Sequence, residues 1–183
     1  TCRCTGEILP ALRMMLSGEE LKTLKVRKNE LIKFYYDSPE NQQDIARPFT
    51  PDAIVYCKSN YLFLNGETPE EVLAEAEKAI PTFTERVGYL PKVLLIKGIG
   101  LVASGDHAKQ CDIILDVFED AMKVAYIARS FGGPHPMTPE QVDFIDNWEV
   151  ENYRRSMVAA TSKGRAENKT IVITGAGGRH SHG

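Results

Sequence analysis

A run of four apolar residues, Val93, Leu94, Leu95 and Ile96, constrains the fold more than any other stretch. A strand that is apolar on both faces has to be covered on both faces, so it belongs at the centre of a sheet. Strand-like segments alternate with helix-like segments along the chain, which indicates the α/β class. The predicted strands are residues 32–36, 54–57, 61–64, 93–97, 101–103 and 171–173.

Helix starts follow a repeated pattern of threonine or serine, then proline, then an acidic residue. Thr68 and Thr138 each precede a proline at the first helical position and a Glu or Gln three residues on, which is typical of a capping box. Ser38 and Thr50 begin partial copies of this pattern. Pro81 lies inside the helix that follows Thr68, and it predicts a kink or a break there.

The longest helix is predicted to start with Asp106 as its N-cap and to end near Ser130, before two glycines and a proline. One face of this helix is apolar at intervals of three or four residues, so it should face the core. The residues of that face are Cys111, Leu115, Phe118, Met122 and Ala125.

Length and composition exclude several classes of partner. The chain has 183 residues and a net charge of −3, so there is no electrostatic reason to expect nucleic acid or an anionic membrane. No apolar run approaches the roughly 20 residues that cross a bilayer. Of four cysteines only Cys2 and Cys4 are close in sequence, and no second pair completes a zinc site. We therefore expect a cytoplasmic protein.

The end of the chain looks like the start of a nucleotide-binding unit. Residues 160–169 are polar and small, as in a linker, and the strand 171–173 leads into a glycine-rich turn. Gly175 and Gly177 would let the backbone approach a pyrophosphate, but a complete site also needs a helix N-terminus after the turn. We expect this truncated motif to bind no NAD.

A few polar residues are candidates for chemistry. Asp52 and Lys58 flank the predicted strand 54–57, and an acid beside a lysine could serve acid–base catalysis, although a solvated ion pair is the alternative. His107 is expected just inside the long helix, facing solvent. His135 lies between two prolines in a loop, where one histidine does not make a metal site.

Residues 95–102, LIKGIGLV, resemble a strand of the class II aldolase/adducin family that has the pattern L-x-x-H-G-L-V. The histidine of that pattern is one of three zinc ligands in the family, and Ile99 stands in its place. An aliphatic side chain has no lone pair to donate to a metal. The resemblance implies a class II aldolase-like three-layer α/β/α fold, with no metal ligand at this position.

Residues 49–64 and 144–157 resemble a narrower group within this family. Its members join an aldolase-type domain to a short-chain dehydrogenase, as in the rhamnulose-1-phosphate aldolase/alcohol dehydrogenase type. The resemblance implies the later half of an aldolase/adducin-like domain over residues 1–159 and a linker over 160–169. Residues 170–183 would then be the truncated start, or stub, of a Rossmann-type dehydrogenase domain.

This group implies a carbohydrate enzyme that is a homo-oligomer and binds a sugar phosphate. Zinc would support retro-aldol cleavage of ketose 1-phosphates, and NAD would serve the dehydrogenase part. Both cofactors are implied for the parent protein, and we expect none in this chain. We expect this chain alone to be inactive. Its only candidate catalytic residues are Asp52 and Lys58. The alternative is a non-catalytic, adducin-like oligomerisation or scaffold domain, with only the dehydrogenase part active in sugar-alcohol phosphate oxidation.

Overall fold

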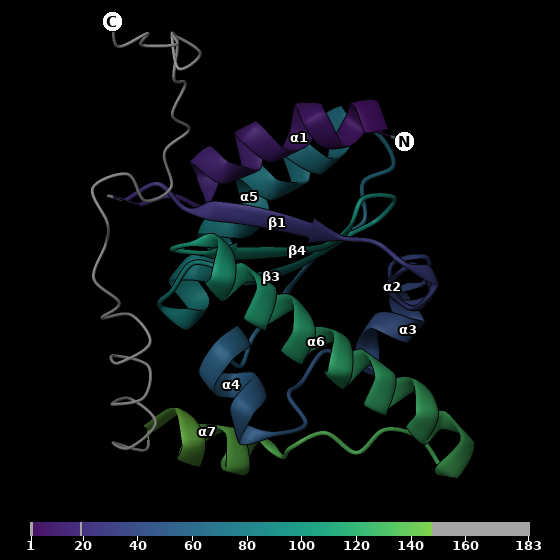
Figure 1. Ribbon diagram of the computed structural model, residues 1–183. Helices are drawn as coiled ribbons and strands as arrows, with labels where there is room; N and C mark the ends of the chain where they lie inside the picture. The colour runs from purple at the N-terminus through teal and green to yellow at the C-terminus, as the bar shows by residue number, and fades with distance from the viewer. Residues whose placement is uncertain (1, 19, 148–183) are drawn as a thin grey trace, which may run out of the picture.

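The computed structural model describes residues 2–18 and 20–147, which form a four-stranded sheet covered by helices on both faces (Figure 1). The strand order is β1-β4-β3-β2. β4 runs antiparallel to both of its neighbours, whereas β2 and β3 are parallel. β1, β2 and β3 therefore all point the same way. The strands are β1 Thr23–Arg27, β2 Leu62–Leu64, β3 Val93–Ile96 and β4 Gly100–Gly105.

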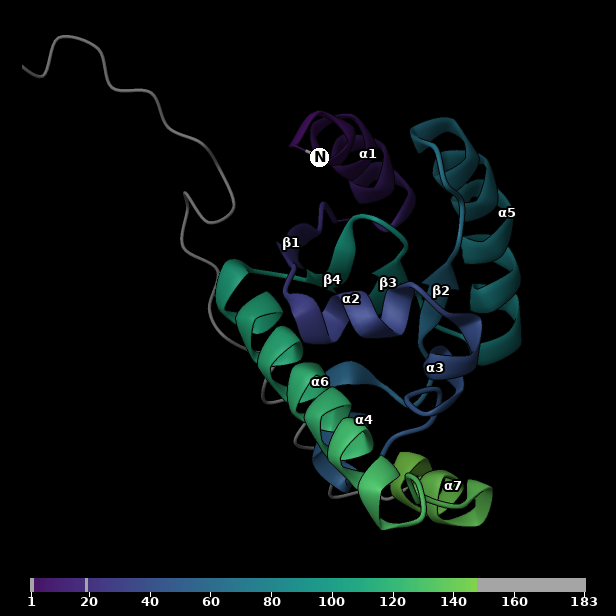
Figure 2. The ribbon, with the colours of Figure 1, turned by 90° about the vertical axis from the view of Figure 1, so that its right-hand side faces the viewer.

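The predicted central strand is confirmed, because all four β3 side chains are fully buried in the interior of the sheet. Val93 and Leu95 pack into the cluster under α2, α4 and α6, whereas Leu94 and Ile96 pack into the cluster under α1 and α5. The two sets of helices form the outer layers (Figure 2). Their bounds are α1 Cys2–Met15, α2 Glu30–Tyr36, α4 Pro51–Cys57, α5 Pro69–Val87 and α6 Ala108–Ala128.

The helix starts predicted at the threonines are confirmed. Thr68 forms both halves of a capping box with Glu71 at the start of α5. The Thr138 amide donates to Gln141 Oε1 at 2.9 Å, and the Gln141 amide donates back to Thr138 Oγ1 at 3.3 Å. α5 continues through Pro81 to Val87, so the predicted break is wrong. The remaining helical segments are α3 Pro39–Gln43, the 3₁₀ turn η1 Arg129–Phe131 and α7 Pro139–Asn147.

Two predicted strands, 32–36 and 54–57, are helices. The side chain of Asn29 accepts a hydrogen bond from the Ile32 amide at 2.9 Å and caps α2. Thr50 caps α4 by accepting from Ala53, and proline follows at the first helical position. These caps satisfy amides that would otherwise lack a partner, and they outweigh the strand preference of aromatic and β-branched residues.

The long helix begins one residue later than predicted. His107 is its N-cap, and His107 Nδ1 accepts a hydrogen bond from the Gln110 amide at 3.2 Å. This histidine is half-buried. The prediction of a solvent-facing residue inside the helix is therefore wrong. Asp106 instead pairs with Lys22. The predicted apolar face of α6 is confirmed, since all five of its residues are buried.

The sequence pattern did not predict β1, which is rich in charge. Lys25 Nζ lies 2.7 Å from Asp112 Oδ2 on α6, and Arg27 reaches Asp116 and Glu119 of the same helix at 2.7 and 2.8 Å. The side chains of Lys25 and Arg27 thus lie beside α6, and the backbone of β1 is held in the sheet by its antiparallel pairing with β4. Within the described ranges, residues 2–18 and 20–147, no helix has the length and apolar character to cross a bilayer.

Candidate functional site

The carboxyl ends of β1, β2 and β3 meet at one edge of the sheet, the edge at which open α/β sheets bind ligands. Lys28 follows β1 there, Gly66 lies in the loop after β2, and Lys97 follows β3. Ile99, the residue singled out by the family resemblance, lies in the turn that leaves β3 at the same edge. We call this region the carboxyl edge.

The turn from β3 to β4 is built by two glycines around Ile99. Gly98 has φ +75°, Gly100 has φ +131°, and a Cβ on Gly100 would lie 2.4 Å from the carbonyl oxygen of Arg27. The turn therefore combines an unusual backbone with a close approach of β1. Ile99 is 6% exposed and packs in the cluster under α1 and α5. The position that the resemblance assigns to a zinc ligand is thus taken by a core side chain.

The amides of the loop between β2 and α5 already have anionic partners within the protein. The Asn65 and Gly66 amides donate to Glu75 Oε2 at 2.8 and 2.9 Å. The Glu67 amide donates to Glu71 Oε2 at 2.8 Å. Amides at such a strand-to-helix turn bind phosphate in nucleotide-binding folds. Here two carboxylates of α5 occupy the place that a phosphate would take.

The two lysines at the carboxyl edge also have partners. Lys97 Nζ lies 2.8 Å from Glu67 Oε1, and this hydrogen bond raises the pKa of Lys97 and lowers the pKa of Glu67. Lys28 Nζ donates to the carbonyl oxygen of Gly98 at 2.7 Å and lies 5.7 Å from the ring centroid of Tyr36. Both ammonium groups therefore stabilise the edge itself.

Asp52 and Lys58 lie at opposite ends of helix α4 and do not flank a strand. Asp52 is exposed in the first turn, where its charge suits the positive end of the helix dipole, and Lys58 is the C-cap. Six residues of helix separate their backbones by about 9 Å along the axis.

Lys58 belongs instead to a polar cluster at the opposite edge of the sheet, before β2 begins. Ser59 Oγ donates to Asp146 Oδ2 of α7 at 2.6 Å, and Asn60 Nδ2 donates to Tyr89 Oη at 3.1 Å. Lys58 Nζ lies 5.0 Å from the ring centroid of Tyr89. The cluster ties α7 to the sheet, and no spacing in the sequence pointed to it.

The backbone of Lys58 has φ 68° and ψ 172°, a conformation that non-glycine residues rarely adopt. Lys58→Gly and Lys58→Ala both remove the side chain, but only glycine relieves this strain. We expect Lys58→Gly to have a free energy of unfolding higher than that of Lys58→Ala by about 1 kcal/mol, measured by urea denaturation. Equal stability of the two variants would contradict backbone strain at this position.

The family assignment follows from a match over residues 4–154, which align with the family model for aldolase class II, second domain. This chain belongs to that family. A comparison with curated proteins finds no match. The matched range of this class II aldolase domain includes both the carboxyl edge and the polar cluster.

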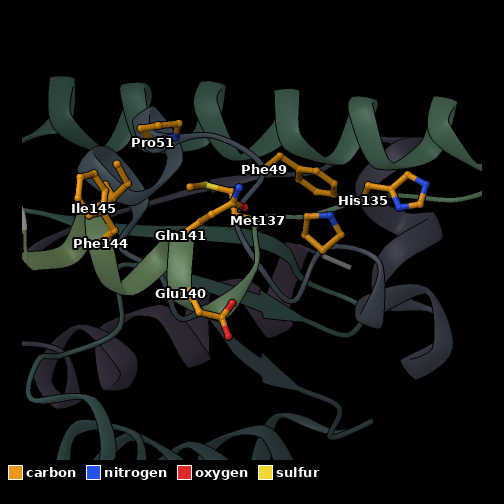
Figure 3. A pocket seen from close by; sticks show the side chains of 9 residues that line it. Phe49, Pro51, His135, Met137, Glu140, Gln141, Phe144 and Ile145 are labelled. Carbon is orange, nitrogen blue, oxygen red and sulfur yellow. The ribbon is translucent and has the colours of Figure 1, made fainter.

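Among the residues that the structure describes, His135 shares no site with the other candidate residues of this class II aldolase domain. His135 lines a cavity of about 490 Å³ beside α7, where it and Glu140 stand apart from one another around the apolar side chains Phe49 and Met137 (Figure 3). No group of three or more histidine, cysteine, aspartate or glutamate residues in the described ranges is placed to hold a metal. Gly175, Gly177, the predicted strand 171–173 and the linker 160–169 lie outside those ranges.

The two described cysteines with placed side chains are not reactive groups of this aldolase domain. Cys57 and Cys111 are both buried as free thiols. Burial raises the pKa of Cys57 to about 12 and the pKa of Cys111 to about 11. Both thiols are therefore protonated at neutral pH and lack the thiolate that nucleophilic or metal chemistry needs.

Proposed function

We propose that this chain is a non-catalytic aldolase-type domain that serves the assembly of a carbohydrate-metabolising protein. The observation that carries this proposal is the buried position of Ile99, because a side chain that fills the core at a ligand position cannot hold the metal of the aldolase reaction. The dehydrogenase part implied by the resemblance at residues 170–178 would then oxidise the sugar-alcohol phosphate with NAD.

The donor set of the described residues does not fit the zinc that this fold family implies. Ile99 offers no lone pair, and the nearby Gly98 carbonyl is engaged by Lys28. A class II aldol cleavage relies on a metal to stabilise the negative charge that develops on the ketose oxygen. Without that metal, the described residues offer no group that would stabilise this charge.

The occupied amides after β2 support the same proposal. A sugar phosphate would have to displace Glu75 and Glu71 from the loop amides before it could bind there. The displaced carboxylates would also remain close to the bound phosphate, and their negative charge would repel it. The family's description as a second domain agrees with a segment that accompanies other parts of a longer protein.

The competing function is zinc-dependent cleavage of ketose 1-phosphates by the parent protein. Lys28 and Lys97 favour it, because two cations at the carboxyl edge would suit a phosphate group if they changed partners. In that case the zinc ligands would come from residues other than those at the carboxyl edge.

Incubation of the chain with a ketose 1-phosphate and added zinc separates the two functions. We expect no dihydroxyacetone phosphate above background in an assay coupled to NADH oxidation, while a metal-dependent aldolase run in parallel supplies the positive control. We also expect light scattering to give a mass above the 20.4 kDa of one chain. Zinc-dependent product release would overturn the non-catalytic role, and a strictly monomeric chain would overturn the assembly role.

A further inference from the structure

β2 is an edge strand of the sheet, because among the described residues it pairs with β3 alone. The Lys97 amide donates to the carbonyl oxygen of Leu64 at 2.9 Å, so Leu64 presents its backbone to the β3 side. Successive residues of a strand present their backbone groups to opposite sides. The N–H and C=O of Phe63 therefore point to the outer edge, where a further strand could pair with them.

A cavity of about 430 Å³ lies beside this outer edge, between β2 and α5. Figure 2 shows α5 running alongside β2. Leu62 of β2 and Tyr61, which comes just before the strand, form one wall, and α5 contributes Phe83 together with the aliphatic and hydroxyl groups of neighbouring residues. The floor is thus apolar enough for one aliphatic side chain to enter.

Two cations stand on the α5 wall of this cavity. Lys78 and Arg86 are both exposed, and neither forms an ion pair with any residue that the structure describes. Arg86 lies 5.7 Å from the ring centroid of Phe83. The one acidic residue of the described cavity wall, Glu75, is held by the Asn65 and Gly66 amides. The wall therefore presents positive charge to a ligand.

The spacing of the two cations matches an extended chain better than a single phosphate. Eight residues of helix separate Lys78 from Arg86 by about 12 Å. Residues four apart on a strand lie about 13 Å from one another and point to the same face. Two acidic residues at positions i and i+4 of a strand paired with β2 would therefore lie opposite the two cations, and residue i+2 would lie over the cavity near Thr82.

We infer that the outer edge of β2 binds an extended acidic segment of another protein. The segment adds a strand through the backbone of Phe63, places acidic side chains at i and i+4 against Lys78 and Arg86, and inserts an apolar side chain at i+2 into the cavity. This is strand addition, in which main-chain hydrogen bonds supply affinity and alternate side chains supply specificity.

Fluorescence anisotropy with a labelled peptide Thr-Glu-Thr-Val-Thr-Glu-Thr tests this inference. We expect saturable binding about tenfold tighter than that of the same peptide with Gln in place of both Glu residues. The double variant Lys78→Glu, Arg86→Glu should weaken binding by about tenfold or more. Lys109→Glu, which reverses an exposed cation on α6, is the matched control and should leave binding unchanged.

A backbone arm separates strand addition from simple charge attraction. N-methylation of the peptide at alternate residues removes the hydrogen bonds to β2, so it should abolish saturable binding, and the amide resonance of Phe63 should shift only with the unmodified peptide. Circular dichroism and unfolding midpoints check that every variant is folded.

Four outcomes would overturn the inference. The Gln peptide could bind as tightly as the acidic one, or the double variant could bind like the wild type, and either result removes the role of charge. Light scattering could also show that the chain forms a dimer that the double variant loses, which would mean that a second copy occupies this edge. Absence of saturable binding at millimolar peptide would likewise refute it.

Discussion

Replacing Phe118 with alanine is expected to lower the free energy of unfolding by about 3–5 kcal/mol. Phe118 is 1% exposed and joins α6 to the sheet, and its ring meets Tyr61 edge to face with 4.6 Å between the ring centroids. Truncation removes this contact and leaves a cavity in the cluster under α2, α4 and α6. Urea denaturation followed by circular dichroism measures the loss.

Phe131→Ala is the matched control, because this ring is 80% exposed at the end of the same helical segment. Its effect should stay within about 0.5 kcal/mol. If Phe118→Ala leaves too little folded protein to measure, Phe118→Leu should still unfold at a lower urea concentration than the wild type. A loss below about 1 kcal/mol for Phe118→Ala would show that this cluster is not the main core.

Gly100→Ala should destabilise the protein by about 3 kcal/mol or more, because strain and steric overlap add together. Its φ of +131° is a glycine conformation, and a Cβ there would lie 2.4 Å from the backbone oxygen of Arg27. That oxygen belongs to β1, so the overlap can be relieved only by moving β1 away from β4. Thermal or urea unfolding of the variant measures the effect.

Gly98→Ala separates the two causes. Gly98 has φ +75°, but a Cβ at this position meets no atom within 4 Å. Only backbone strain remains, and it should cost about 1–2 kcal/mol. Equal losses for the two alanine variants would argue against the close approach of β1 to the turn at Gly100.

The threonine caps were readable from the sequence because each acts locally. A capping threonine, its proline and the Glu or Gln lie within four residues, so their spacing alone specifies the hydrogen bonds seen at Thr68 and Thr138. The apolar run of β3 and the stripe of α6 were readable for a similar reason, since burial repeats with the period of the element.

Residues 32–36 and 54–57 show where composition misleads. Both segments are rich in aromatic or β-branched side chains, yet each follows a capping residue, Asn29 or Thr50. Side-chain type records what can pack on a pleated surface, whereas a cap decides whether the first amides of a helix find partners. The cap at Thr50 was visible in the sequence, and it proved the stronger signal.

The sequence by itself determined the α/β class, the central strand and the threonine helix caps, since each depends on residue type and short spacing. Only the tertiary structure decided the order of the strands, the burial of Ile99, the occupation of loop amides by Glu75, and the polar cluster of Lys58 with Tyr89. Sheet order and the cluster join segments distant in the chain, and the Glu75 contact depends on how α5 packs after its loop. Such contacts are fixed by the packing of layers, which a local pattern does not record.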